Sequence, residues 1–99
     1  MAINLHHLRL FTAVVQHGGF TKAAGKLNLS QPAISKSLNE LERQLDLELI
    51  ERTGRTVRLT DAGRTLYARA SELFGVERAA EQELRELRGL KRGTLRIAA

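Results

Sequence analysis

The chain has 99 residues, of which 16 are Lys or Arg and 11 are Asp or Glu, and it contains no Cys. This length fits one small domain with an appendage and is too short for two independent cores. Without Cys there is no disulfide framework and no thiolate metal site. No apolar run is long enough to cross a membrane and the first residues lack the features of a signal peptide, so we expect a cytoplasmic protein. The net charge of +5 fits a polyanionic partner, but also an ordinary soluble protein.

The distribution of charge is more informative than its total. The only charged residues before position 40 are basic: Arg9, Lys22, Lys26 and Lys36. The charged residues of 40–51 are acidic except for Arg43, and three arginines follow in "ERTGRTVRLT". A helix that crosses position 40 would be basic at its N-terminal end and acidic beyond it. Such a helix could direct its N-terminal end toward phosphates.

The first two segments with apolar side chains at helical spacing are predicted helices. In the first, the apolar positions are Leu5, Leu8, Phe11 and Val15. Gly18-Gly19 supplies a stop signal for this helix. In the second, the apolar positions are Ala23, Ala24 and Leu27. Asn28 then predicts a turn, because Asn tolerates a positive φ.

A third helix is predicted from residue 30 or 31 to about Leu45. Either Ser30 or Gln31 can cap it, and Pro32 suits a first turn, where its missing N–H costs nothing. Four apolar positions form one narrow stripe on this helix: Ile34, Leu38, Leu41 and Leu45. The stripe is expected to face the core, which leaves the opposite face available.

The available face has the side chains of a DNA-reading surface. Pro32, Lys36, Asn39 and Arg43 lie opposite the stripe, and Gln31 and Ser35 lie on its flank near the N-terminus. Gln can bond adenine, Lys can reach guanine or phosphate, Ser can donate or accept, and Pro32 or Ala33 can touch a thymine methyl group. Two helices joined by a tight turn form a helix-turn-helix, which delivers this end to the major groove. The alternative is an ordinary solvated face.

The segment after the third helix predicts a wing. Gly54 marks a turn, and Val57 and Leu59 alternate with Arg58, which is the pattern of a two-stranded ribbon. Arg52, Arg55 and Arg58 would place positive charge on this ribbon. A wing of this kind can lie along a DNA backbone or in a minor groove, where the negative potential is enhanced.

A long helix is predicted from Thr60 and Asp61 to about Leu90. It carries an apolar stripe at Leu59, Ala62, Leu66, Ala70, Leu73, Ala80, Leu84 and Leu87. A helix of some thirty residues is roughly 45 Å long, and its distal half has no core of its own chain to cover the stripe. A second copy of the same helix is the expected cover, which predicts a symmetric dimer. The alternative is a solvated helix stabilised by pairs such as Glu81 with Arg85.

The stretch "FTKAAGKLNLSQPAISKSLNELERQLDLELIERTGRTVRLTDAG" closely resembles the DNA-binding domain of LysR-type transcriptional regulators. The matching elements, in order and at the spacing of the family, are the Ala pair at 23 and 24, Ser30-Gln31-Pro32, Ser35, Leu41-Glu42, Leu49, Arg52, Leu59-Thr60 and Gly63. The resemblance covers nearly the whole chain.

The resemblance implies a mainly α fold, a winged helix-turn-helix over residues 1–59 followed by a linker and dimerisation helix over 60–91. Residues 92–99 would begin a larger effector-binding domain that this chain lacks, with Leu95 and Ile97 in its first strand. The partners it implies are double-stranded DNA, a second copy of the chain with scope for a tetramer of the longer protein, and a small-molecule effector on the missing domain.

Two sets of functional residues are expected. The DNA-binding set is Lys22, Ser30, Gln31, Pro32, Ala33, Ser35, Lys36, Asn39, Arg43, Arg52 and Arg55. The dimer-interface set is Leu66, Ala70, Leu73, Ala80, Leu84 and Leu87.

The chain departs from the family pattern at three positions. Family members usually have Gly where Asp46 stands, and Asp in a left-handed cap costs about 1 kcal/mol relative to Gly. Ile50 replaces an aromatic residue, which is a tolerable exchange in a core. Lys36 stands where Arg is frequent, and an ammonium group lacks the planar fork with which Arg binds guanine bidentately.

Catalytic and metal-binding functions find no support in the sequence. His6 and His7 are neighbours that point about 100° apart on a helix, and His17 lies off either face, so no metal or other cofactor is expected. The serines have no adjacent base in a recognisable arrangement. The sequence therefore predicts a non-catalytic, sequence-specific DNA-binding domain that binds an inverted-repeat operator as a dimer. The alternatives are a non-specific architectural DNA-binding protein and a winged helix used for protein contact.

Overall fold

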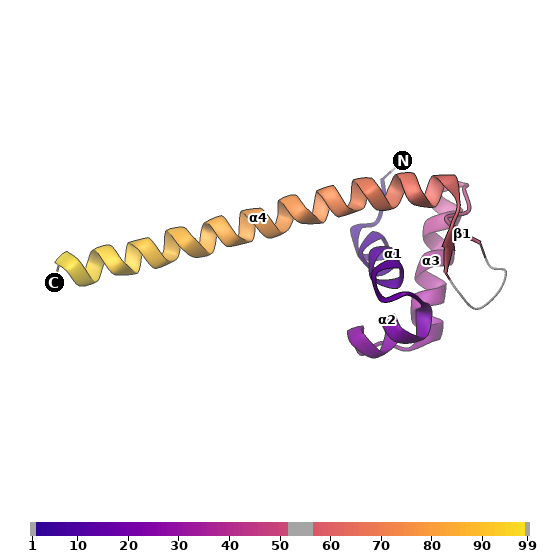
Figure 1. Ribbon diagram of the computed structural model, residues 1–99, viewed down its shortest axis with the longest axis horizontal. Coiled ribbons are helices and arrows are strands. Elements are labelled where there is room, and N and C mark those ends of the chain that lie inside the picture. The colour runs from indigo at the N-terminus through magenta and orange to yellow at the C-terminus, as the bar shows by residue number, and fades with distance from the viewer. Residues whose placement is uncertain (1, 52–56, 99) are drawn as a thin grey trace.

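The computed structural model describes residues 2–51 and 57–98, the stretch 91–98 by its backbone. Four helices and two short strands follow one another as α1 (Leu5–His17), α2 (Phe20–Leu27), α3 (Gln31–Leu45), β1 (Ile50–Glu51), β2 (Arg58–Leu59) and α4 (Asp61–Ala98). The elements before α4 form a small body, and α4 crosses that body and extends far beyond it (Figure 1). The molecule measures 63 × 29 × 18 Å. This arrangement confirms the predicted mainly helical winged helix-turn-helix with a long C-terminal helix.

The core of the body lies where α1, α2 and α3 meet. Phe11 and Val14 of α1 are fully buried, and Ile34, Leu38 and Leu41 of α3 pack against them. The predicted stripe of α3 is therefore confirmed as its buried face.

Two of the apolar side chains whose spacing predicts α1 and α2 are exposed. Leu5 is 56% exposed and Leu27 is 37% exposed. Leu5 is the first residue of α1 and Leu27 the last residue of α2. The end of a helix has neighbours on fewer sides than its middle, so helical spacing alone overestimates burial there.

The ends of the helices are fixed by local signals that the sequence contains. The side-chain oxygen of Asn4 accepts hydrogen bonds from two N–H groups in the first turn of α1, at 2.9 and 3.1 Å. Gly18 ends α1 with φ +80°, and Asn28 ends α2 with φ +56°. Asp46 ends α3 with φ +55°, in the left-handed conformation that Gly adopts at lower cost.

The two strands form the predicted antiparallel ribbon. Ile50 lies opposite Leu59 and Glu51 lies opposite Arg58. Ile50 is buried, so it fills the core position that is more often aromatic in the family. The turn of the wing, with Arg52 and Arg55, falls outside the described residues.

Thr60 caps α4 and ties it to the segment before β1. Its hydroxyl accepts a hydrogen bond from the N–H of Gly63 at 3.0 Å and donates one to the carbonyl of Glu48. Its own N–H donates to the carbonyl of Leu49 at 3.0 Å. The backbone approach is so close that a Cβ at position 63 would lie 2.0 Å from the Leu49 oxygen. Only Gly fits this position without a backbone shift.

Glu42 joins the C-terminal half of α3 to the same junction. Its carboxylate accepts the N–H of Leu49 at 2.8 Å and that of Ile50 at 3.4 Å. These N–H groups belong to the residue before β1 and to its first residue, which are held next to the first turn of α4. One acidic side chain and one Gly thus connect α3, the ribbon and α4.

The first half of α4 packs on the body. Ala70 is 1% exposed, and Phe74 is also buried in the core. The ring of Tyr67 meets that of Phe11 edge to face, with centroids 6.4 Å apart. Ala70 was expected in the dimer interface, and this expectation is wrong, since the side chain is already covered by its own chain. Leu66 is half-buried against the same core.

The second half of α4 continues beyond its predicted end near Leu90. The backbone stays helical to Ala98, so Leu95 and Ile97 lie in a helix and not in the expected strand. An extended segment needs a neighbouring strand for its N–H and C=O groups, whereas a helix satisfies them internally. Among the described residues the only strands are the two-residue pair of the ribbon. No helix in this described part is long and apolar enough to cross a membrane.

We expect Gly63→Ala to destabilise the fold by about 3 kcal/mol, because the added methyl group must displace the backbone of Leu49. Gly89→Ala is the matched control in the same helix, where a Cβ meets nothing within 4 Å. It should stabilise the helix by about 0.5–1 kcal/mol. Urea denaturation followed by circular dichroism measures both. Equal effects of the two substitutions would contradict the close approach.

Candidate nucleic-acid interface

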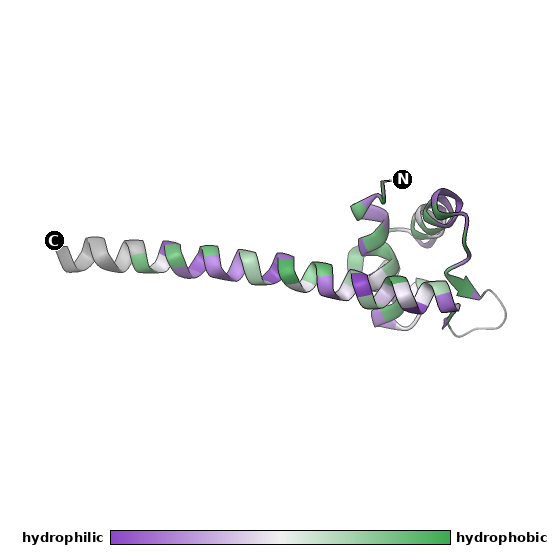
Figure 2. Ribbon diagram, turned by 90° about the horizontal axis from the view of Figure 1, so that it is seen from above, coloured by the Kyte–Doolittle hydropathy of each residue, from purple (hydrophilic) through white to green (hydrophobic). Residues whose placement is uncertain are grey.

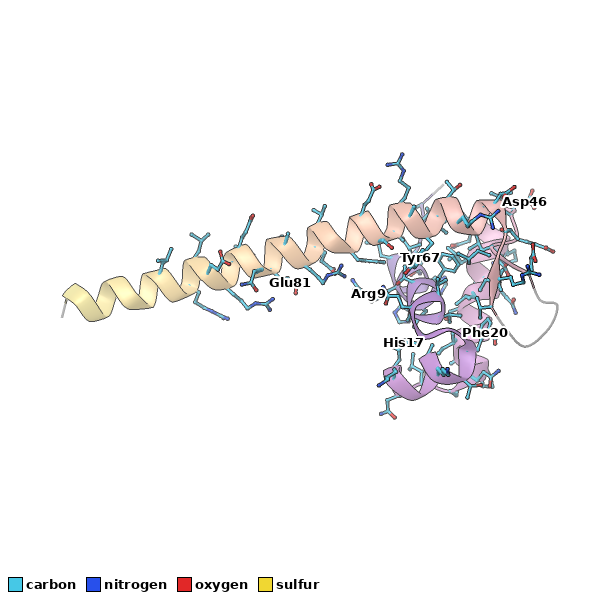
Figure 3. All side chains as sticks on the ribbon, in the orientation of Figure 1. Arg9, His17, Phe20, Asp46, Tyr67 and Glu81 are labelled. Atoms are coloured by element: carbon cyan, nitrogen blue, oxygen red, sulfur yellow. The ribbon has the colours of Figure 1, made fainter. Side chains whose placement is uncertain are left out.

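The segment from α2 to α3 forms the predicted helix-turn-helix. α2 ends at Leu27 and α3 begins at Gln31, so the turn is short. In Figure 1, the N-terminal end of α3 lies beside α2 on the side of the body away from α4. Figure 3 labels Asp46, which follows the other end of α3, close to the start of α4. The N-terminal end of α3 is thus presented at the face opposite α4.

Ser30 is the residue that caps α3. Its hydroxyl oxygen accepts a hydrogen bond from the N–H of Ala33 at 3.2 Å, and Pro32 occupies the first turn. Of the two possible caps in the sequence, the structure therefore selects Ser30. This hydroxyl already has a structural role, so any contact of Ser30 with DNA would be additional to it.

Most of the predicted DNA-binding residues reach solvent, at the N-terminal end of α3 and further along it. Those with exposed side chains are Lys22 on α2 and Gln31, Pro32, Ala33, Lys36, Asn39 and Arg43 on α3. Ser35 is half-buried. The first turn of α3 contains no acidic residue to oppose an anion. The positive end of the helix dipole and the Lys36 ammonium group therefore act on the same region.

Gln31 is held by a contact that the sequence did not reveal. The hydroxyl of Thr21, on α2, donates a hydrogen bond to the Gln31 side-chain oxygen at 3.3 Å. A carboxamide oxygen has two lone pairs, so it can accept this bond and a second one from a ligand. Thr21 is ten residues away in the sequence, and no periodic pattern predicts the pair. Its effect is to restrict the orientation of the Gln31 amide.

Arg43 forms an ion pair within α3. Its guanidinium lies 2.6 Å from the carboxylate of Glu40. This hydrogen bond first, and the opposite charge second, lower the pKa of Glu40 and raise the pKa of Arg43. A phosphate contact by Arg43 has to compete with Glu40, which makes Lys36 the more accessible cation of α3.

The described part of the wing contributes one cation. Arg58 of β2 is exposed and lies opposite Glu51 of β1. The other two wing arginines of the expected set, Arg52 and Arg55, are not among the described residues. Their contacts stay predictions.

Residues 5–64 match the sequence model of a family described as "Bacterial regulatory helix-turn-helix protein, lysR family". The match covers more than half of the chain and spans the body with the first turn of α4. The chain belongs to the lysR family. This confirms the resemblance that the Ala pair, Ser30-Gln31-Pro32 and Gly63 indicate.

Individual members of the family are similar over nearly the whole chain. The RuBisCO operon transcriptional regulator of Allochromatium vinosum is 43% identical over 98 residues, which are 99% of this chain and 32% of that protein. The crystal structure of the BenM DBD/catB site 1 DNA complex has a TM-score of 0.76 at 39% identity, and the match covers 87% of this chain and 94% of that one. The full-length virulence activator AphB of Vibrio cholerae has a TM-score of 0.75 at 31% identity, over 82% of this chain and 28% of that one.

These lysR-family relatives are regulators and not enzymes, which agrees with the non-catalytic interpretation of the sequence. The chain spans about a third of the length of the first of them. In the residues that the structure describes, no group of three His, Asp or Glu side chains is placed to hold a metal ion.

Ser30→Ala should cost the domain about 1 kcal/mol, because the N–H of Ala33 loses its acceptor at the start of α3. Ser30→Asp keeps an acceptor at the cap and should retain the stability of the parent chain. Thermal unfolding of both variants provides the comparison. If both substitutions have the same effect, the hydroxyl of Ser30 does not cap α3.

Proposed function

We propose that this lysR-family domain reads an inverted-repeat operator in double-stranded DNA as a homodimer. The observation that carries the proposal is the N-terminal end of α3, which lies on the side of the body away from α4 (Figure 1) and has the exposed side chains of Gln31 and Lys36. A related domain of the same fold has been crystallised as a DNA complex, at 39% identity to this chain. The similarity supports the same use of the body here.

The chemistry of this end suits a major groove. The amide of Gln31 can donate to and accept from adenine while Thr21 holds its oxygen. Lys36 can reach guanine or an adjacent phosphate, and the exposed carbons of Pro32 and Ala33 can contact a thymine methyl group. Half-buried Ser35 stands one turn after Gln31 and can donate or accept at the edge of a base.

The remaining cations would contact the DNA backbone and so contribute affinity more than sequence selectivity. Lys22 on α2 and Arg58 on β2 are exposed at the body surface. Asn39 and Arg43 lie further along α3, and Arg43 would exchange Glu40 for a phosphate. We retain Arg52 and Arg55 as wing contacts on the basis of the family resemblance.

The exposed apolar side chains of α4 support the dimer. On its distal half Leu84 is 65% exposed, and Leu87 and Leu90 are exposed as well; Leu73 and Val76, nearer the body, are also exposed. Figure 2 shows apolar residues recurring along α4 beyond the body. Leu66, Leu73, Ala80 and Leu87 recur every seven residues, which is the spacing of helices that pair in coiled coils. A second α4 can cover them.

The acidic segment 40–51 gives less support to a winged helix used for protein contact. Glu40 is paired with Arg43, and the Glu42 carboxylate accepts the backbone N–H groups of Leu49 and Ile50. Both carboxylates therefore already have partners within the chain. A non-specific architectural role would require little discrimination between sequences, and the Gln31 test below separates it from operator binding.

Three features of the longer regulator belong to the same proposal. An effector-binding domain would follow the linker helix of residues 60–91, beginning at 92–99, and bind a small molecule. The whole protein would act in the cytoplasm. Its dimers could assemble further into tetramers.

We expect Gln31→Ala to weaken binding to the preferred operator by about 1–3 kcal/mol and to leave binding to random duplex DNA nearly unchanged. The preferred operator is first selected from a random pool with the parent protein. Gln44→Ala is the matched control, since Gln44 is exposed near the other end of α3. Competition binding gives both affinities. Equal losses on both DNAs would assign a non-specific role to Gln31.

We expect Leu84→Asp to produce a folded monomer, because a paired α4 would bury the new carboxylate without a partner. The monomer should lose far more affinity for a full operator than for a single half-site, since the linked second contact is lost. Gln82→Asp adds the same charge on the opposite side of α4 from the stripe and should remain dimeric. Sedimentation and binding to full and half operators measure these effects. A dimeric Leu84→Asp variant with unchanged operator binding would refute the α4 interface.

A further inference from the structure

We propose that Arg9, acting with Phe74 and Glu77, is a positioning residue that fixes the angle between α4 and the body and so selects the spacing between operator half-sites. The proposal rests on the dimeric DNA binding proposed above. It assigns a role to a contact between α1 and α4 that lies outside the reading face, with Glu77 seven residues before Leu84, at the body end of the exposed stripe.

The contact combines an ion pair with a stacked cation. One terminal nitrogen of Arg9 lies 3.0 and 2.8 Å from the two carboxylate oxygens of Glu77. The guanidinium carbon lies 4.4 Å from the centre of the Phe74 ring, which is itself buried in the core. Figure 3 shows Arg9 on α1 beneath α4. A planar guanidinium held by a ring and a carboxylate has a defined orientation, which an ammonium group would lack.

The position of this contact along α4 gives it a geometric role. The junction at Thr60 and Gly63 holds the first turn of α4. Glu77 is about 24 Å further along, at 1.5 Å per residue. From Val76 to Leu90 every side chain is exposed, so the Arg9 contact lies at the end of the region where α4 touches the body. Between the two, Tyr67, Ala70 and Phe74 pack on the body, and a contact at the far end of this packed region has the most leverage on the direction of α4.

The angle matters because α4 acts as the arm between the body and the dimer interface. With the junction as pivot, a swing of about 6° over the roughly 34 Å of α4 from Asp61 to Leu84 moves the body by about 4 Å relative to the interface. This is close to the rise of one base pair, about 3.4 Å. In a dimer both arms can swing, which doubles the change in the distance between the two bodies. A dimer that distinguishes half-site spacings differing by one base pair therefore needs an arm held within a few degrees.

The ion pair is too exposed to contribute much to the stability of the fold. The side chains of Arg9 and Glu77 are 51% and 44% exposed, and such pairs in water contribute little. Loss of the ion pair should therefore change the direction of α4 relative to the body, while the fraction of folded protein stays nearly the same. The pair of Arg69 with Glu72, at 3.2 Å within α4, provides a matched control that cannot orient α4 on the body.

The first test measures the angle without DNA. The chain has no Cys, so Lys26→Cys and Gln82→Cys place one spin label on α2 and one on α4. Labelled chain is diluted with unlabelled chain, so that only distances within one chain are measured. Arg9→Lys and Glu77→Gln should broaden the distance distribution, and Arg69→Lys should leave it unchanged. An unchanged distribution in both Arg9→Lys and Glu77→Gln would overturn the proposal. Loss of the folded state in both would also overturn it, since the contact would then serve folding.

The second test measures spacing selectivity. The parent protein and the same variants bind duplexes in which the half-site separation changes by one base pair at a time, and a duplex with one half-site. The parent should lose about tenfold in affinity per base pair away from its optimum, and Arg9→Lys and Glu77→Gln about threefold or less, with half-site affinity unchanged. A spacing profile identical to that of the parent would overturn the inference. A parent protein without preference for paired half-sites would instead contradict the proposed function.

Discussion

The backbone contact between Gly63 and the carbonyl of Leu49 is the constraint on which the rest of the structure depends. No side chain can occupy position 63, because the Leu49 oxygen lies where a Cβ would be. The same short segment before β1 receives the Thr60 cap of α4 and the Glu42 carboxylate of α3. The direction of α3, the start of the ribbon and the start of α4 are therefore set at one place. A change there would alter all three elements together.

This junction divides α3 into two parts with different roles. The C-terminal part is committed to structure, through Glu42 and through Asp46, whose left-handed backbone is held by an N–H bond to the carbonyl of Arg43 at 3.3 Å. The N-terminal part has a buried stripe and an exposed face whose side chains make few contacts within the chain. Its Ser30 cap keeps the first turn in place. The exposed face can therefore vary in sequence without disturbing the element that carries it.

The features that the sequence predicted are those determined by neighbouring residues. Helical spacing identified the buried face of α3, and cap and turn residues such as Ser30, Asn28 and Asp46 marked its ends and those of α2. Contacts between residues far apart in the chain leave no such pattern in the sequence. The pair of Arg9 with Glu77, which are 68 positions apart, is an example. Spacing also cannot tell which partner covers an apolar stripe. For this reason Ala70 was assigned to a second copy, although its own body buries it.

The buried face and the exposed stripe of α4 explain why folding and assembly would be separate in this chain. Phe74 faces the body, and Leu84 lies about 80° around the helix from it, on the exposed stripe. A second helix can approach the stripe while the body keeps its own face of α4, so pairing requires no contact of the core to break. The energy of a dimer would then depend on the distal apolar residues alone, and its geometry on the attachments of the proximal half. Substitutions on the stripe would change the association constant, whereas substitutions at the body contact would change the angle between two associated bodies.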